Sequence, residues 1–305
     1  MDVRSGVLSA AFAALAAASG CTSSPYQEVK VDMSPPPPTS PELTVPARPL
    51  LRFSVAAIQS PRDTYAAYSR FFERMGTLLG VEIQFVQRRS YAEVNELLVT
   101  GKIDAALVCT GGYLDLVQHA PGSVEVLAVP VIGGQTTYRS LLIVPASSRA
   151  SSPQDLGGKR FAFTDELSFS GHMYPVQLLA NMRAPHFFGS TLFTRSHDRS
   201  IEAVVQGVVD GAAVDSLVYE ALTARDRRIA MGTRVIHRSP PFGLMPVVAS
   251  TRMSREARDR LRAILLDLHR DPPSAAALRE VRIERFATPE PGMYDAAAAV
   301  AERAR

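Results

Sequence analysis

The chain carries one helix–strand unit twice, and the copies lie 106 residues apart, with Gly101 and Asp104 in the first and Gly207 and Asp210 in the second. In each copy a helix pattern ends at the glycine and a short apolar strand pattern follows the aspartate. A chance recurrence of a common α/β pattern is the alternative, but the identities span both the turn and the strand. Open α/β sheets bind ligands at the carboxyl ends of their strands. The duplication therefore predicts two lobes, each presenting a strand end to a shared cleft.

Strand patterns alternate with helix patterns along the rest of the chain, which favours an α/β fold with a mixed, mostly parallel sheet in each lobe. Residues 138–144 have the pattern of one long apolar strand that crosses between the lobes, and a return crossing follows the strand pattern at 234–238. We therefore expect residues 50–138 and 241–305 to form lobe 1 and residues 139–240 to form lobe 2. The ligand cleft should lie between the two lobes.

The N-terminal segment has the pattern of an export signal. Residues 7–18 are small and apolar, too short a stretch to span a bilayer, and they lead into Cys21. This pattern resembles a bacterial lipoprotein signal, which predicts a signal peptide at 1–20 and a lipid on Cys21. The proline-rich residues 21–49 then predict an extended tether of at most roughly 80 Å.

An ordinary secretory signal with a cysteine nearby is the alternative, but a tether of this kind suits a membrane-anchored domain. The expected location is a bacterial membrane, with the protein facing the periplasm or the cell exterior. The pattern does not distinguish an inner from an outer membrane.

Composition excludes several classes of protein. The net charge of +3 is small, and no basic stripe interleaves with aromatic residues, so no nucleic-acid partner is expected. The two cysteines are Cys21 and Cys109. With Cys21 lipidated, Cys109 has no disulfide partner and should be a buried, inert thiol. The six histidines lack the spacing of metal ligands, so we expect no metal and no cofactor.

A polar loop follows one of the predicted strands. Ser168, Ser170 and Gly171 lie between a strand pattern and a helix pattern. Hydroxyl groups and free backbone amides at the start of a helix form a site for an anion. A plain helix cap is the alternative interpretation of the same residues.

Three further residues occupy related positions in the duplicated unit. His197 follows a serine at the start of the second copy, as Tyr91 does at the start of the first. Asp215 ends the apolar strand pattern of the second copy, and a carboxylate there needs a partner if it is buried. These positions predict that the three side chains face the cleft.

These motifs resemble the periplasmic substrate-binding proteins of phosphonate, phosphite and phosphate ABC importers, the PhnD-like family. The resemblance runs from about Leu51 to Val248. Five motifs carry it most specifically, at residues 138–144, 155–163, 168–171, 196–198 and 210–216.

The resemblance implies a two-lobed periplasmic-binding-protein fold. It also implies an extracytoplasmic solute-binding lipoprotein, not an enzyme, that captures a small anionic ligand for an ABC permease. In such proteins a serine-rich loop grips phosphoryl oxygens through hydroxyls and amides, and a tyrosine, a histidine and an aspartate close the site. Carried over by motif, the ligand-binding residues are Tyr91, Tyr138, Ser168, Phe169, Ser170, Gly171, His197 and Asp215.

One residue departs from the family pattern, because Phe169 stands where the family has threonine. The change removes a hydroxyl donor, a loss of roughly 1.5–3 kcal/mol if that donor bound a charged group. It should also add an apolar wall that favours a substituted phosphonate, so Phe169→Thr should strengthen the binding of the smallest oxyanions. His197, as a histidine beside an anion, should titrate upward, so we expect binding to weaken as the pH rises well above neutrality.

Two other functions fit parts of the pattern. A tethered sensor for a signalling partner would have the same fold and ligand. Ser168, His197 and Asp215 also suggest a hydrolase triad, but Leu167 and Phe169 flank the serine, so the Gly-x-Ser-x-Gly motif is absent.

Overall fold

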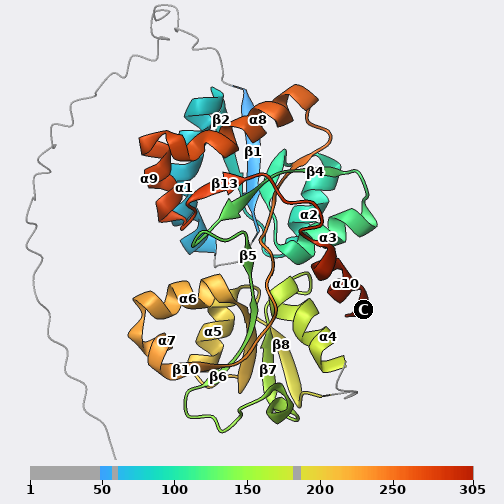
Figure 1. The fold of residues 1–305 in the computed structure, drawn as a ribbon, viewed down its shortest axis with the longest axis vertical. Helices are drawn as coiled ribbons and strands as arrows, with labels where there is room; N and C mark the ends of the chain where they lie inside the picture. Colours follow the sequence, from blue (N-terminus) through green and yellow to red (C-terminus); the bar gives the residue numbers. More distant parts are fainter. Residues whose placement is uncertain (1–48, 57–60, 181–186, 305) are drawn as a thin grey trace, which may run out of the picture. The chain divides into compact units, whose positions relative to one another are not determined.

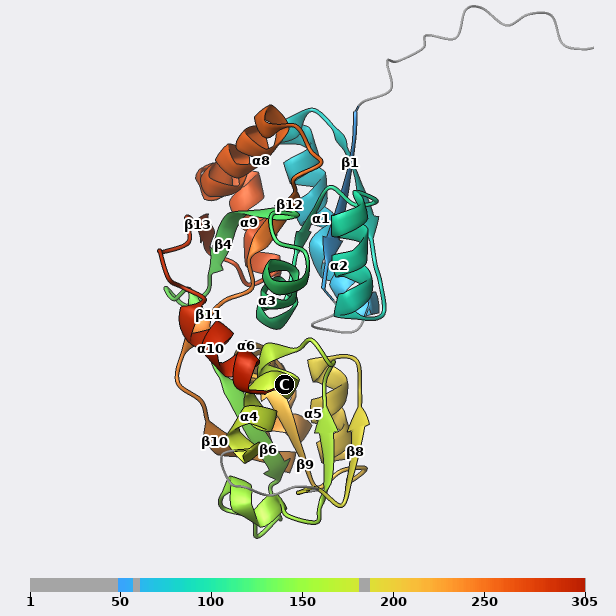
Figure 2. The same ribbon diagram turned by 90° about the vertical axis from the view of Figure 1, so that its right-hand side faces the viewer.

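The computed structural model describes residues 49–56, 61–180 and 187–304 of the 305-residue chain. The predicted signal peptide, Cys21 and the tether lie outside these described residues. Ala47–Arg305 form one compact unit, and Figures 1 and 2 show two sheets in separate lobes of it, joined by crossing segments. No helix among the described residues has the length and apolar character needed to cross a membrane.

The sheet of the first lobe has six strands in the order β13-β4-β12-β3-β1-β2. Its strands are β1 (Leu50–Val55), β2 (Glu82–Val86), β3 (Ala105–Leu107), β4 (Val124–Val131), β12 (Val247–Ser250) and β13 (Arg285–Ala287). Strand β1 pairs in parallel with β2 and β3. Strand β12 is antiparallel to β3 and β4, and β13 is antiparallel to β4.

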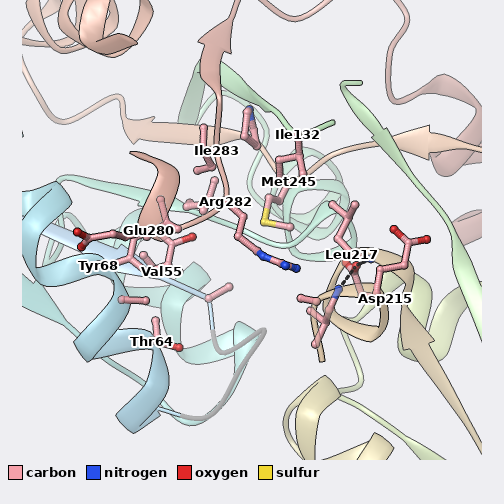
Figure 3. A pocket seen from close by; sticks show the side chains of 18 of the residues that line it. Val55, Thr64, Tyr68, Ile132, Asp215, Leu217, Met245, Glu280, Arg282 and Ile283 are labelled. Atoms are coloured by element: carbon pink, nitrogen blue, oxygen red, sulfur yellow. Dashed lines mark hydrogen bonds between the residues drawn. The ribbon is translucent and has the colours of Figure 1, made fainter. Parts of the chain in front are cut away.

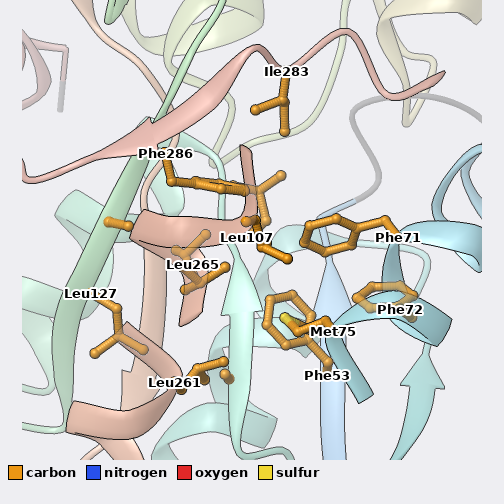
Figure 4. Packing of buried hydrophobic residues seen from close by; sticks show 14 of the residues in the cluster. Phe53, Phe71, Phe72, Met75, Leu107, Leu127, Leu261, Leu265, Ile283 and Phe286 are labelled. Carbon is orange, nitrogen blue, oxygen red and sulfur yellow. The ribbon is translucent and has the colours of Figure 1, made fainter. Parts of the chain in front are cut away.

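Helices cover both faces of this sheet. They are α1 (Pro61–Leu79), α2 (Tyr91–Thr100), α3 (Thr110–His119), α8 (Arg255–Asp267) and α9 (Pro272–Glu280). Helices α1, α8 and α9 bury one face in an apolar cluster that includes Phe53, Phe72 and Leu265 (Figure 4). Helices α2 and α3 bury the other face in a second cluster, to which Leu98 and Leu116 belong.

The sheet of the second lobe has five strands in the order β10-β6-β9-β7-β8. Its strands are β6 (Ser140–Pro145), β7 (Arg160–Phe163), β8 (Ser190–Phe193), β9 (Gly211–Asp215) and β10 (Thr233–Arg238). Strand β7 is parallel to β8 and β9, whereas β6 is antiparallel to β9 and β10. The surrounding helical segments are η1 (Pro153–Leu156), η2 (Phe169–Met173), α4 (Tyr174–Ala180), α5 (His197–Val205), α6 (Ser216–Arg225) and α7 (Arg227–Gly232).

Two short strands, β5 (Thr137–Tyr138) and β11 (Phe242–Gly243), pair antiparallel where the chain passes between the lobes. The expected single strand over residues 138–144 is therefore wrong, because it breaks at Arg139 into β5 and β6. The Arg139 amide donates to the Ser216 hydroxyl at 3.0 Å, which takes it out of the ladder. The C-terminal helix α10 (Asp295–Arg303) contacts α3 in one lobe and α4 and η2 in the other (Figure 2).

The α/β fold with two lobes is confirmed, and both sheets are mixed. In each sheet the parallel pairs lie around β1 or β7, and the remaining pairs are antiparallel. Strands that follow a crossing, such as β12 and β6, enter their sheet against the direction of β3 and β9. The sheets are therefore less parallel than the alternating pattern of strands and helices predicts.

In the first lobe an arginine holds the glycine turn of the duplicated unit. The backbone amide and Nε of Arg52 donate to Oδ2 of Asp104 at 2.7 and 3.0 Å. Its Nη2 donates to the Gly101 carbonyl at 3.0 Å. Gly101 has a φ of 71°, in the left-handed region that favours glycine, so the turn and the arginine together end helix α2.

The second lobe repeats this network. The amide and Nε of Arg160 donate to Oδ2 of Asp210 at 2.9 and 3.1 Å, and its Nη2 donates to the Gly207 carbonyl at 3.0 Å. Gly207 has a φ of 70°. The same contacts therefore join β1, the end of α2 and β3 in lobe 1, and β7, the end of α5 and β9 in lobe 2, which supports a true duplication of the unit.

Asp104→Ala should lower the free energy of unfolding by about 2 kcal/mol, because it removes a charge-assisted arginine pair and a backbone hydrogen bond. Asp210→Ala should cost about 1 kcal/mol or less, since the Asp210 side chain is 38% exposed and the Asp104 side chain 18%. Urea unfolding measures both changes. Asp259→Ala, which removes exposed pairs with Arg255 and Arg262, is the control. Equal losses in all three variants would contradict a structural role for the network.

Candidate ligand-binding site

Tyr91 begins helix α2 and lies between the lobes. Ser90 caps the helix by accepting the Glu93 amide, and the Tyr91 side chain is only 1% exposed. The Tyr91 hydroxyl has no hydrogen-bond partner among the described residues. Its backbone amide donates across the cleft to Oδ2 of Asp165 at 3.4 Å. Burial raises the pKa of Tyr91 well above its usual value, and ionisation of the neighbouring Cys109 and Asp165 would raise it further.

The loop at 168–171 forms the start of a helical segment, η2 followed by α4. Ser168 precedes it, and its hydroxyl accepts the Gly171 amide at 3.1 Å. A Cβ on Gly171 would lie 2.4 Å from Oγ1 of Thr164, so only glycine fits this position. Ser168 is therefore a helix cap, as the alternative interpretation held. The Gly171 amide donates to it and is not free to bind a ligand.

Ser170 differs from Ser168, because its buried hydroxyl has no partner with hydrogen-bond geometry among the described residues. Its carbonyl accepts from the Ser140 hydroxyl at 2.6 Å, which holds the backbone in place. Burial raises the pKa of the neighbouring Tyr138 well above its usual value, while the nearby hydroxyls of Thr110 and Ser170 act in the opposite direction. Tyr91 thus buries a hydroxyl without a partner in the described chain, and Ser170 buries one that has the Tyr138 hydroxyl nearby but no partner that meets hydrogen-bond geometry.

The Phe169 ring packs into an apolar cluster. It is fully buried and packs against Phe242, with ring centroids 4.7 Å apart, in a cluster that includes Leu114 and Tyr174. This packing favours a structural role for the ring, and the expected selection of substituted ligands by Phe169 stays a prediction. Phe169→Thr would remove a core side chain and should destabilise the protein rather than strengthen binding.

His197 begins helix α5, the counterpart of α2, and is 1% exposed. Its Nδ1 accepts the Asp215 backbone amide at 3.1 Å, so the ring proton belongs on Nε2, which lies 3.5 Å from the Ser168 hydroxyl. Burial lowers the pKa of His197 to about 3. Desolvation outweighs the nearby charge of Asp198, so the ring is neutral in this structure, and the expected upward shift beside a bound anion stays a prediction.

Asp215 ends β9 and caps helix α6. Its Oδ1 accepts the amides of Leu217 and Val218 at 2.7 and 3.3 Å. The residue is 2% exposed, and burial raises its pKa to about 7 in spite of these hydrogen bonds. Near neutral pH, Asp215 is therefore divided between a carboxylate and a carboxylic acid that can donate a hydrogen bond.

The three residues of the suggested triad do not form one. His197 Nδ1 faces the backbone amide of Asp215 and not its carboxylate, which instead caps α6. With its proton on Nε2, the ring cannot accept a proton from Ser168 at that nitrogen. The hydrolase interpretation fails on this geometry.

The two lobes touch at the candidate site. A Cβ on Gly111, near the start of α3, would lie 2.2 Å from the Leu167 carbonyl of the other lobe. Only a glycine allows this approach. Together with the contact between Tyr91 and Asp165, it brings Tyr91 from lobe 1 to the side of the cleft where Ser170 and Asp215 lie.

Sequence reasoning missed Asp165, which is 1% exposed and has a pKa raised by burial. It follows strand β7 almost directly, so the signal that identified Asp215, an acid at the end of an apolar strand, was present there as well.

Cys109 is buried as expected, and burial raises the pKa of its thiol to about 11. A pocket of about 810 Å³, which Asp215 borders, opens between α6 and residues 280–283 (Figure 3).

Comparison with known proteins identifies a family. Residues 53–294 match the family described as ABC transporter, phosphonate, periplasmic substrate-binding protein, whose members bind substrates and are not enzymes. The phosphate-import protein PhnD of Mycolicibacterium smegmatis is 28% identical over 187 residues, 55% of this chain and 57% of that protein. The phosphonates-binding periplasmic protein of Escherichia coli is 24% identical over 238 residues, 76% of this chain and 70% of that protein. The chain thus spans little more than half the length of the first relative.

Solved structures support the fold. A binding protein component of an ABC phosphonate transporter from Pseudomonas aeruginosa superposes with a TM-score of 0.75 at 22% identity, over 81% of this chain and 83% of that one. PhnD1 from Prochlorococcus marinus, solved in complex with methylphosphonate, also has a TM-score of 0.75, at 19% identity over 83% and 97% of the two chains. These likenesses confirm the two-lobed fold of periplasmic binding proteins.

Proposed function

This chain belongs to the family of periplasmic substrate-binding proteins of phosphonate ABC transporters. We therefore propose that its cleft captures a small oxyanion, of the phosphonate, phosphite or phosphate type, and delivers it to an ABC permease. The ligand contacts are the part that goes beyond family membership. We assign them to Tyr91, Tyr138, Ser170 and Asp215, with Ser168, Gly171 and His197 holding the loop in place.

The observation that carries this assignment is the pair of buried, unpartnered hydroxyls on Tyr91 and Ser170. A buried hydroxyl without a partner costs about 1–3 kcal/mol, so two of them on opposite lobes need a compensating ligand. An oxyanion supplies several acceptors at once. Within η2 a further donor can come only from the first two amides, since the Gly171 amide binds the Ser168 hydroxyl and the next two amides bind the Ser168 carbonyl.

Neutral groups complete the site. The pKa of His197, lowered to about 3, leaves an uncharged ring whose Nε2–H points toward Ser168 and supports the loop. Asp215 in its protonated form can donate to an anion, whereas its carboxylate would repel one. Recognition then depends on hydrogen-bond donors more than on a buried cation.

Ligand binding should close the lobes. A ligand that contacts Tyr91 on one lobe and Ser170 on the other binds the closed arrangement of the lobes better than an open one. This difference in affinity shifts the equilibrium between the two arrangements toward the closed one. The contact between Gly111 and Leu167 and the one between Tyr91 and Asp165 belong to the closed arrangement.

We also propose that Cys21 carries a lipid and that the proline-rich segment after it tethers the binding domain to a bacterial membrane. The support is the signal pattern of the sequence and the compact unit that begins at Ala47. The partners are then a small anionic ligand, an ABC permease and the membrane that holds the lipid.

Tyr91→Phe and Ser170→Ala should each weaken methylphosphonate binding by about tenfold or more, the effect of losing one hydrogen bond to a charged group. Neither should lower the stability of the ligand-free protein, because neither hydroxyl has a partner to lose. Isothermal titration calorimetry and urea unfolding measure the two quantities. Tyr65→Phe, the same change at a 59% exposed tyrosine of lobe 1, is the control. Wild-type affinity in both site variants would overturn the assignment.

Oxyanion binding should weaken as the pH rises through the Asp215 pKa of about 7. Below that pKa the Asp215 carboxylic acid donates a hydrogen bond to the ligand. Above it, Asp215 must first take up a proton, which lowers the affinity by up to about tenfold per pH unit. Asp215→Asn keeps an uncharged donor and should remove this dependence, leaving only that of the ligand itself. Calorimetry at about pH 6 and about pH 8 provides the comparison. Parallel pH profiles for wild type and variant would contradict the role of Asp215.

Cys21→Ser should release the protein from the membrane fraction without changing its affinity for ligand, because the tether separates the anchor from the binding domain. Metabolic labelling with palmitate, followed by membrane fractionation, tests this outcome. A wild-type protein without label would disprove the anchor.

A further inference from the structure

The pocket beside Asp215 is larger than a tetrahedral oxyanion requires. Its volume of about 810 Å³ lies within the range of roughly 300–1,000 Å³ that is typical of sites for organic ligands. Most of its lining is apolar and comes from both lobes. Val55, Ile132, Met245 and Ile283 belong to lobe 1, whereas Leu217 and Val218 belong to α6 of lobe 2 (Figure 3). Such a lining suits an alkyl or aryl group.

Arg282 extends into the middle of this pocket, toward Leu217 and Asp215 (Figure 3). Its side chain has no hydrogen-bond or ion-pair partner in the part of the chain that the structure describes. The residue has a φ of 61° and occupies the turn after α9, where its amide donates to the Arg279 carbonyl at 3.0 Å. Glycine adopts this conformation at lower cost, so the fold does not require an arginine there.

The charges around the pocket favour an acidic group. Arg225 is a second lining arginine that has no ionic partner among the described residues. Of the acids, Glu280 pairs with Arg70, and the pKa of Asp215 is raised to about 7. Glu220, Arg225 and Arg282 are exposed, and none of the three has an ionic partner among the described residues, so these side chains leave one net positive charge at the pocket.

We propose that this pocket is a second subsite of the cleft, which takes the organic substituent of a phosphonate and binds an acidic group at the end of that substituent through Arg282. The inference rests on the proposed function, because Tyr91 and Ser170 would hold the phosphonate group. Asp215 connects the two regions, since it lines the pocket and its charge also acts on Tyr91 and Tyr138. The favoured ligand is then an amphipathic dianion rather than inorganic phosphate.

The test compares three probes by calorimetry: methylphosphonate, butylphosphonate and a butylphosphonate that carries a carboxylate at its chain end. The wild type should bind the carboxylated probe about tenfold or more tightly than butylphosphonate, the gain expected from one charge-assisted hydrogen bond. Arg282→Gly should remove this gain and leave methylphosphonate binding unchanged. Because glycine suits the backbone at this position, the variant should fold at least as stably as the wild type. Arg279→Ala removes an equal charge nearby, at an exposed residue outside the pocket lining, and should keep the gain.

The results separate the inference from the function on which it rests. Equal affinity of the wild type for the two butyl probes, or an unchanged gain in Arg282→Gly, would overturn the second subsite while methylphosphonate binding still supports the proposed function. If no phosphonate binds the wild type, the proposed function fails and the subsite fails with it.

Discussion

Each lobe depends on one contact, in which an arginine of β1 or β7 binds the aspartate and the glycine carbonyl between a helix and the strand that follows it. Arg52 makes this contact in lobe 1 and Arg160 makes it in lobe 2. Because it ties the carboxyl end of the helix to the sheet, the amino end of the same helix is held at the cleft. Tyr91 and His197 begin these helices, so the duplicated contact positions one cleft residue in each lobe.

Desolvation then determines the chemistry of the cleft. His197 and Asp215 are almost fully buried, and burial moves the pKa of the histidine down to about 3 and that of the aspartate up to about 7. Both residues therefore tend toward their neutral forms, and the site gains hydrogen-bond donors without a fixed buried charge. The unpartnered hydroxyls of Tyr91 and Ser170 fit this account, since a ligand oxygen can satisfy each of them.

The sequence was sufficient to predict the features that depend on periodicity. It located the duplicated unit, the helix ends at Gly101 and Gly207, and Asp215 at the end of a strand. It could not predict the direction of the Phe169 ring, because a loop residue can face the cleft or a core that segments distant in sequence assemble. It also could not predict the charge of His197, which depends on how completely the folded lobes exclude water. The pocket around Arg282 joins residues from α6 and from the segment after α9, which no local pattern connects.

A crystal structure of the binding domain with methylphosphonate tests the central claim most directly. The account predicts a phosphonate group between the lobes, with its oxygens within hydrogen-bond distance of the Tyr91 and Ser170 hydroxyls and one oxygen facing Asp215. A phosphonate bound elsewhere, with both hydroxyls still buried and unpartnered, would contradict it.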